Sequence, residues 1–330
     1  MTQEKLAMPS FTELRKSAYY AEKKSAAGRA AKELLLRIFR IVLISGVCYV
    51  ILSPLIGLVA TSFFSNSDFY NPMVYIIPME GNFQHYKVAI DCMKYWSRMP
   101  MTLLYALSLT LLQVLLCSLT GYGFARFKFP LKKVLFACVV VMIVLPVHTI
   151  TLSLYMSFRT FDPLGIVTAI RGEPLNLMRT PWPMYILTAL GCGLNSGLFI
   201  YIFHQFFRGL PKEIEEAALV DGAGTAYTYF RIILPNATPA VVTVSVFSMV
   251  WQYNDTFYSG LFNIDADVVI GRCLATLQGT IASVMKINDP NISRLYLNAG
   301  IVLIILPILI VYLLLQKRFV EGVERSGIVG

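Results

Sequence analysis

The sequence predicts an all-α integral membrane protein with six transmembrane helices. Only 14% of its 330 residues are charged, whereas an average soluble domain has about 25%. The uncharged residues gather in six blocks of at least 22 residues that contain no Asp, Glu, Lys or Arg. About 20 apolar residues cross a bilayer as a helix, which satisfies its own backbone hydrogen bonds there. The blocks are residues 41–64, 101–125, 134–158, 182–207, 232–254 and 295–316.

The residues before the first block, 1–40, are polar and carry charges of both signs. They are too long and too charged for the first region of a secretory signal peptide, and the block that follows is too long for its apolar region. We therefore expect a cytoplasmic N-terminal arm that is helical over residues 23–40.

The basic residues predict the orientation of the six spans. If the N-terminus is cytoplasmic, 19 of the 28 Lys and Arg lie on the inner side. This excess follows the positive-inside rule and places both termini in the cytoplasm of a bacterial cell membrane. The net charge of +9 is then explained by anionic membrane lipid as the partner, and not by nucleic acid.

Proline and cysteine add detail to the spans and loops. Pro146 lies midway in the third block and predicts a kink. Residues 159–181 are rich in Pro and Gly and predict an irregular loop. Cys92 and Cys273 both fall in outer loops, where a disulfide is chemically allowed, but spacing alone leaves their pairing open.

The segment 209–235, between the fourth and fifth blocks, predicts a short helix, a tight turn and a second helix. Pro211 suits the first helical position, and Glu213 complements the helix dipole in the first turn. Gly222 can adopt the left-handed conformation that ends a helix, and Thr225 can cap the next one.

One face of this short helix combines Ile214, Ala217, Ala218 and Asp221 by their spacing of three and four residues. The two alanines keep that face thin, so a second protein could approach it closely. Asp221 either pairs with a basic residue of that partner or simply precedes the turn, and the sequence leaves both alternatives open.

The same segment resembles the EAA loop of the permeases of binding-protein-dependent (type I) ABC importers. The family pattern is Glu-Ala-Ala, three residues, Gly, nine residues, Ile, any residue and Leu-Pro. Every fixed position is filled at that spacing, by Glu216, Ala217, Ala218, Gly222, Ile232, Leu234 and Pro235. Further likeness around residues 195–211, 247–255 and 316–323 is closest to the second, maltose-system-like permease of the carbohydrate and oligosaccharide subfamily.

The resemblance implies a permease domain over residues 41–316, with the coupling loop 209–235 inside it, and a cytoplasmic tail over residues 317–330. It also implies a heterodimer with a second permease, an ATPase dimer that holds ATP and Mg, and an extracytoplasmic solute-binding protein. By this resemblance the residues that couple to the ATPase are Glu216, Ala217, Ala218, Asp221 and Gly222.

The chain itself has no Gly-Lys pair and therefore no phosphate-cradling GxxxxGK[ST] loop. We expect it to bind no cofactor and to hydrolyse no ATP. We identify no catalytic residue and no metal-ligating residue, since HExxH and other metal-ligand spacings are absent from the sequence.

A polar and aromatic group near the outer end of the fifth block is a candidate substrate pathway. Aromatic faces stack on sugars, and amides and carboxylates bond their hydroxyl groups. The alternative is an interfacial aromatic belt with helix packing. The candidate residues are Trp251, Gln252, Tyr253, Asn254 and Asp255, together with Asn195 of the fourth block.

Three other functions compete with the import of a sugar. An ABC permease for another small polar solute would have the same motifs. A secondary transporter or channel usually needs ionisable groups within its spans, and these spans contain histidines but no deep carboxylate. An intramembrane serine protease would need Gly-x-Ser-Gly, which the stretch 193–197 does not match.

Overall fold

The computed structural model describes residues 11–327, and over this range the chain is helical, with no β-strand beyond one isolated bridge between Phe161 and Leu175. The predicted all-α class is confirmed. The chain divides into two units, residues 1–60 and 61–330. The first ten residues of the predicted arm and the last three of the predicted tail lie outside the described residues.

The first unit consists of α1 (Phe11–Ser62), which continues two residues beyond it. The helix predicted for residues 23–40 is part of α1, so no break separates the arm from the first apolar block. Residues 32–62 are long and apolar enough to cross a membrane.

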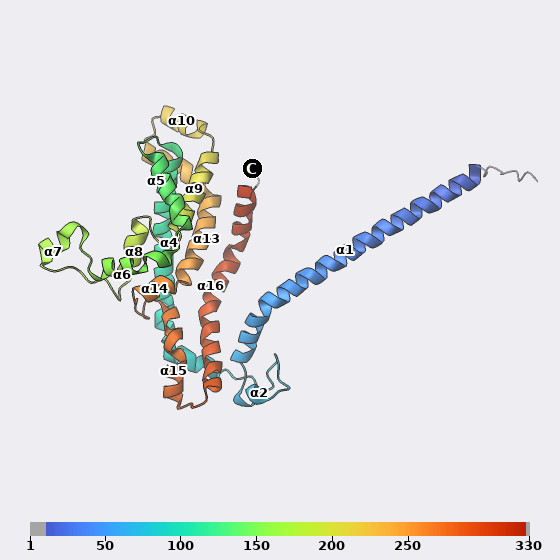
Figure 1. Cartoon of the computed structure of the whole chain (residues 1–330), viewed down its shortest axis with the longest axis horizontal. Coiled ribbons are helices and arrows are strands. Elements are labelled where there is room, and N and C mark those ends of the chain that lie inside the picture. The colour runs from blue at the N-terminus through green and yellow to red at the C-terminus, as the bar shows by residue number, and fades with distance from the viewer. Residues whose placement is uncertain (1–10, 328–330) are drawn as a thin grey trace, which may run out of the picture. The chain divides into compact units, whose positions relative to one another are not determined.

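The second unit contains the remaining helices, and Figure 1 labels those for which there is room. Short 3-10 helices cover Val147–Ile150, Pro163–Gly165 and Ile270–Cys273, and a π-helix covers Tyr229–Ile233. The α-helices are α2 (Asn66–Tyr70), α3 (Gln84–Met93), α4 (Tyr95–Arg126), α5 (Lys132–Val144), α6 (Thr151–Arg159), α7 (Ile166–Arg171), α8 (Trp182–Ala189), α9 (Ser196–Gly209), α10 (Glu213–Val220), α11 (Thr225–Thr228), α12 (Leu234–Asn236), α13 (Thr238–Tyr253), α14 (Phe257–Leu261), α15 (Leu274–Met285) and α16 (Pro290–Gly327).

Three helices satisfy the length and hydropathy of a membrane span over the described residues: α1, α4 and α16. Two further predicted spans are bent pairs. The third bends by 101° between α5 and the helical segment 147–159, and the fifth by 78° between residues 225–236 and 238–261. The predicted kink at Pro146 is confirmed as a break in the helix, because Pro146 is extended there. Length and composition thus support three to five spans.

The prediction of one continuous helix over residues 182–207 is wrong. This block forms α8 and α9, which are separated by six non-helical residues, 190–195. Gly191 (φ 71°) and Asn195 (φ 56°) have left-handed backbone conformations, which an α-helix cannot continue through.

The core of the second unit lies between α4, α9, α13 and α16, which run alongside one another (Figure 1). Aromatic side chains of α9, including Phe199, Phe203 and Phe207, are fully buried. Gly121 of α4 permits the close approach of α9, because a Cβ atom there would lie 2.6 Å from the Cβ of Phe203. The outer surfaces of α4 and α16 expose large apolar side chains, as lipid-facing helices do.

The loop regions agree in part with the sequence. Residues 159–181 contain only one α-helix, the six-residue α7, and are otherwise irregular. Cys92 and Cys273 are free thiols. Cys273 instead lies 3.2 Å from the Arg98 guanidinium, which donates to its Sγ atom.

Candidate functional site

The helix predicted in the 209–235 loop is α10, and its ends are set by local chemistry. Three glutamates occupy its first turn, where they complement the helix dipole. At its other end Gly222 has φ 78°, the Gly222 N–H donates to the Leu219 carbonyl at 3.1 Å, and the Ala223 N–H donates to the Ala218 carbonyl at 3.0 Å. These two bonds form a Schellman motif. The predicted role of Gly222 in ending the helix is confirmed.

The predicted role of two flanking residues needs correction. The helix begins at Glu213, so Pro211 precedes it and is not its first residue. Thr225 is the first residue of α11, whose N-cap is Gly224, and its side chain makes no capping bond. The turn is therefore stabilised by the backbone of Gly222 and Ala223 and not by a threonine hydroxyl.

The predicted thin face is divided between the interior and the surface. Ala218 is only 5% exposed, and Ile214 packs against the aromatic core. Ala217 and Asp221 are exposed. Residues 214 and 218 share one stripe of the helix, whereas successive residues point about 100° apart, so Ala217 turns outward when Ala218 turns inward. Ala218 therefore packs α10 against the rest of this chain and does not face a partner protein.

The surface that α10 presents is larger and more apolar than two alanines. Glu216 and Ala217 are exposed, and Leu219 and Val220 expose 56% and 87% of their surface. Apolar side chains exposed in this way on a short helix are typical of a surface that a partner protein covers. The role of the individual residues in coupling stays a prediction.

A buried ion pair attaches α10 to the end of α4. Arg126 Nε lies 2.8 Å from Glu215 Oε1, and the two side chains are 6% and 16% exposed. Arg126 also donates to the Leu210 carbonyl at 2.7 Å. Burial raises the pKa of Glu215, while the guanidinium of Arg126 acts to lower it. The pair therefore links the loop mechanically to a span-length helix.

A second polar site lies in the interior, centred on Gln113 of α4. Gln113 is completely buried. Its Nε2 donates to the Leu194 carbonyl at 2.7 Å and to Ser196 Oγ at 2.9 Å. Its Oε1 accepts from Ser248 at 2.7 Å and from Gln252 Nε2 at 3.2 Å. We call Gln113, Ser196, Ser248 and Gln252 the Gln113 cluster. It joins α4, the broken segment 190–195 and α13.

The Gln113 cluster leaves one buried oxygen without a partner among the described residues, Oε1 of Gln252. Buried polar atoms are normally hydrogen-bonded, and an exception calls for an explanation such as a ligand or water. The sequence pattern indicates Gln252 as a candidate pathway residue but does not indicate Gln113 or Ser248. The available signal was a glutamine in the middle of a charge-free block.

The other candidate pathway residues have mixed environments. Trp251 stacks between Phe199 and Phe247, with both centroids 5.4 Å away. Tyr253 is buried and donates to the Ile304 carbonyl at 2.6 Å. The carboxylate of Asp255 accepts from the Ser259 N–H at 2.7 Å and from the Tyr258 N–H at 3.1 Å.

Asn254 and Asn195 are exposed, so they are the pathway residues available to an external molecule. Trp251, Tyr253 and Asp255 already have packing or hydrogen-bonding roles within the chain. The structure brings Asn195 and Gln252 to the same region, because Gln113 contacts both Leu194 and Gln252. Whether any of the six contacts a substrate stays a prediction.

Comparisons with known proteins place these features in a family. Residues 113–325 match the family model described as binding-protein-dependent transport system inner membrane component. The chain is 24% identical to the diacetylchitobiose uptake system permease protein NgcG of Streptomyces coelicolor, covering 84% of each chain. It is 23% identical to the sn-glycerol-3-phosphate transport system permease protein UgpE of Salmonella typhi, covering 86% of this chain and 94% of that protein.

Among solved structures, the chain is similar to one from a bacterial ABC transporter involved in the import of the acidic polysaccharide alginate. The TM-score is 0.67 and the identity 18%, and the match covers 86% of this chain and 96% of that one. At this identity the likeness shows a common fold.

Proposed function

The chain belongs to the family of binding-protein-dependent transport system inner membrane components, and from this premise we propose that it is the permease subunit of an ATP-driven importer of a sugar or oligosaccharide. It is a transporter permease and a multi-pass membrane protein. Similarity to NgcG, whose name specifies diacetylchitobiose uptake, supports the carbohydrate class. Similarity to UgpE makes a small phosphorylated polyol the alternative solute.

The observation that carries the proposal is α10, an exposed short helix that ends in a Schellman motif at the Gly222 of the EAA pattern. In the proposed mechanism α10 docks on a separate ATPase subunit, and the ATPase dimer binds ATP and Mg. Glu216, Ala217, Asp221 and the apolar Leu219 and Val220 form the contact. The Arg126–Glu215 pair transmits the displacement of α10 to α4.

We further propose six membrane crossings, with α8 and α9 together as a broken fourth span beside the two bent pairs and the three continuous helices. Both termini and the 209–235 loop then lie in the cytoplasm. A second permease completes the pathway, and an extracytoplasmic binding protein delivers the solute. The Gln113 cluster lies in the interior of this bundle, where discontinuous helices of transporters often form solute sites.

Uptake by proteoliposomes tests this function. The chain is reconstituted with the second permease, ATPase and binding protein that the proposed importer requires, and labelled diacetylchitobiose, an α-glucoside and sn-glycerol 3-phosphate are offered separately. We expect a sugar to accumulate only when all subunits are present and ATP is supplied on the side of the membrane that the ATPase faces. Uptake by the chain alone without ATP would show a secondary transporter, and uptake of glycerol phosphate alone would replace the carbohydrate assignment.

A further inference from the structure

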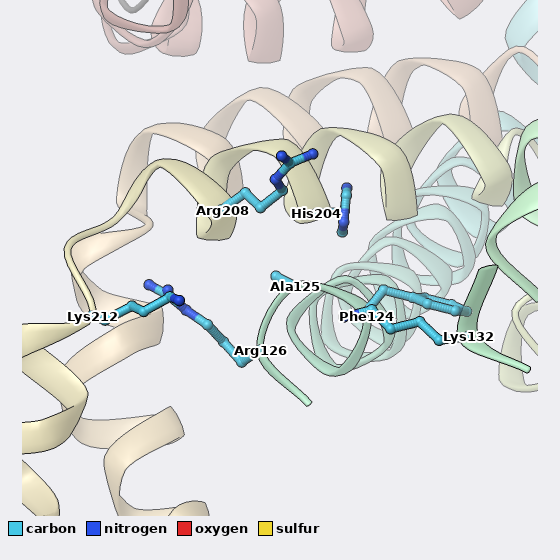
Figure 2. Close-up of a pocket in the computed structure, with 7 residues that line it drawn as sticks. All are labelled: Phe124, Ala125, Arg126, Lys132, His204, Arg208 and Lys212. Atoms are coloured by element: carbon cyan, nitrogen blue, oxygen red, sulfur yellow. The ribbon is translucent and has the colours of Figure 1, made fainter. Parts of the chain in front are cut away.

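A basic cavity of about 370 Å³ lies where the ends of α4, α5 and α9 meet the segment before α10 (Figure 2). Its polar lining consists of Arg126, Lys132, His204, Arg208 and Lys212. These residues come from four different parts of the chain. Neither the coupling surface of α10 nor the Gln113 cluster uses this cavity.

The cavity has more positive charge than its own surroundings neutralise. Glu215 pairs with Arg126, and Lys132 donates to the Phe127 carbonyl at 2.9 Å. Within the part of the chain that the structure describes, the side chains of Arg208 and Lys212 make no hydrogen bond and no ion pair. Two cations therefore remain available to an anion that enters the cavity.

His204 adds an independent observation. It is 7% exposed, and its Nδ1 atom has no hydrogen-bond partner among the described residues. Its ring packs against Phe136 with a centroid separation of 4.3 Å, which fixes its position in the wall of the cavity. A buried ring nitrogen without a partner is unfavourable unless a ligand or water supplies one. In the tautomer that carries its proton on Nδ1, the neutral ring can donate a hydrogen bond to a phosphate oxygen.

The surroundings of the cavity are apolar as well as basic. A neighbouring hollow of about 420 Å³ shares Lys132 and adds Lys128 and Lys133 together with Phe129 and Leu131. Leu131 is 71% exposed and Phe129 36%. Basic side chains interspersed with exposed apolar ones suit the boundary between lipid headgroups and acyl chains. A free anion would use only the basic residues.

We propose that this cavity binds the phosphate group of an anionic phospholipid, with Arg208, Lys212 and His204 as its principal contacts. Its position at the end of the span-length α4 places it at headgroup depth. In the orientation proposed above this is the inner leaflet. The bound lipid would lie against the base of the 209–235 loop and stabilise the attachment of α10 to α4.

Native mass spectrometry of the purified full chain tests the proposal, with phosphatidylglycerol and phosphatidylcholine titrated separately. We expect phosphatidylglycerol to bind more tightly. The double variant Arg208→Gln/Lys212→Gln should weaken it about fivefold for each charge removed. Arg231→Gln is the matched control, because Arg231 is exposed and basic in the same loop but does not line the cavity.

A second variant keeps the proposal testable if the double variant misfolds. His204→Phe retains an aromatic ring against Phe136 and should also weaken phosphatidylglycerol binding, with the unfolding temperature unchanged. Equal binding of both lipids, or an equal loss in Arg231→Gln, would overturn the proposal. Equilibrium dialysis with inorganic phosphate distinguishes a lipid headgroup from free phosphate as the ligand. If inorganic phosphate binds the wild type but not the double variant, and the wild type shows no preference between the two lipids, the cavity is a site for a free anion and the proposal is wrong. None of these measurements requires transport, so they are independent of the proposed function.

Discussion

The 209–235 loop and the Gln113 cluster hold polar groups in opposite ways. In the loop, Glu216 and Asp221 are exposed, and the backbone is satisfied by bonds between near neighbours. In the cluster, Gln113 and Ser248 are completely buried and bond across α4, α13 and the 190–195 segment. The loop is thus a locally stabilised element on the surface, whereas the cluster depends on how three parts of the chain pack.

This difference separates two requirements of a transporter. A helix that docks on a partner has to hold its own shape while its surroundings move, and local capping provides that. A polar cluster that joins several helices changes when those helices shift, so it suits a site that opens and closes. The Arg126–Glu215 pair combines features of both regions. It belongs to the loop, but it is buried and depends on a contact with α4.

The largest expected effect comes from breaking the turn of the loop. Gly222→Pro is incompatible with φ 78° and removes the N–H that bonds the Leu219 carbonyl. Proline requires φ near −65°. We expect solute uptake to fall more than tenfold while membrane insertion, followed by the amount of chain in the membrane fraction, stays normal.

A matched pair of milder variants isolates the backbone effect. Gly222→Ala and Gly224→Ala each add one methyl group into open space. Gly224 has φ −70° and accommodates alanine, whereas alanine at position 222 is strained by about 1–2 kcal/mol. Only Gly222→Ala should reduce uptake. Normal uptake by Gly222→Pro would remove the turn from the coupling mechanism.

The next effect concerns the connection between loop and bundle. Arg126→Gln leaves the Glu215 carboxylate buried without its partner, and we expect a loss of about 3 kcal/mol in the free energy of unfolding. Glu213→Gln removes an exposed carboxylate from the same turn and should cost less than about 1 kcal/mol. Thermal unfolding of the detergent-solubilised chain measures both.

The pH dependence sharpens this test. Burial raises the pKa of Glu215, so the folded chain binds this proton more tightly than the unfolded chain does. The burial of the Glu215 carboxyl therefore lowers the stability of the folded chain as the pH rises from the usual pKa of glutamate to the pKa of Glu215 in the folded chain. Removal of Arg126 raises that pKa further. The deficit of Arg126→Gln should be full at about pH 8 and shrink toward about pH 5, and a deficit independent of pH would contradict this.

A smaller effect is expected in the interior. Gln113→Leu removes the donor to the Leu194 carbonyl and the acceptor of Ser248. We expect a loss of about 1–2 kcal/mol in the free energy of unfolding and faster hydrogen exchange over residues 190–195. Gln205→Leu is the control, because Gln205 is an exposed glutamine of α9. Equal loss in both variants would show that the cluster has no special role.

The sequence predicts the loop better than the cluster for a physical reason. The turn at Gly222 depends on residues within six positions of one another, and those residues carry recognisable preferences. The helical class and the break at Pro146 also follow from local composition. The inward orientation of Ala218 could not be predicted, because it depends on the core that Ile214 meets.

The break between α8 and α9 shows the limit more clearly. Residues 182–207 are free of charge and contain Gly191, Gly193 and Gly197, a pattern that suits a close-packed helix equally well. Asn195, whose backbone is left-handed, directly follows Leu194. The Leu194 carbonyl accepts a hydrogen bond from Gln113, which belongs to another helix. A pattern within one segment carries no information about that distant glutamine.

The smallest effect on stability should come from Gln252→Met, which also decides whether the Gln113 cluster belongs to the solute pathway. Methionine has a similar shape, and it removes the 3.2 Å bond to Gln113 together with the unpaired Oε1. The two changes oppose each other, so the free energy of unfolding should change by less than about 1 kcal/mol.

If Oε1 of Gln252 accepts a hydrogen bond from a solute hydroxyl, KM for uptake by Gln252→Met should rise about fivefold. Ser248→Ala, which removes a bond to the same glutamine, should leave KM unchanged, and an unchanged KM in Gln252→Met would assign Gln252 to helix packing.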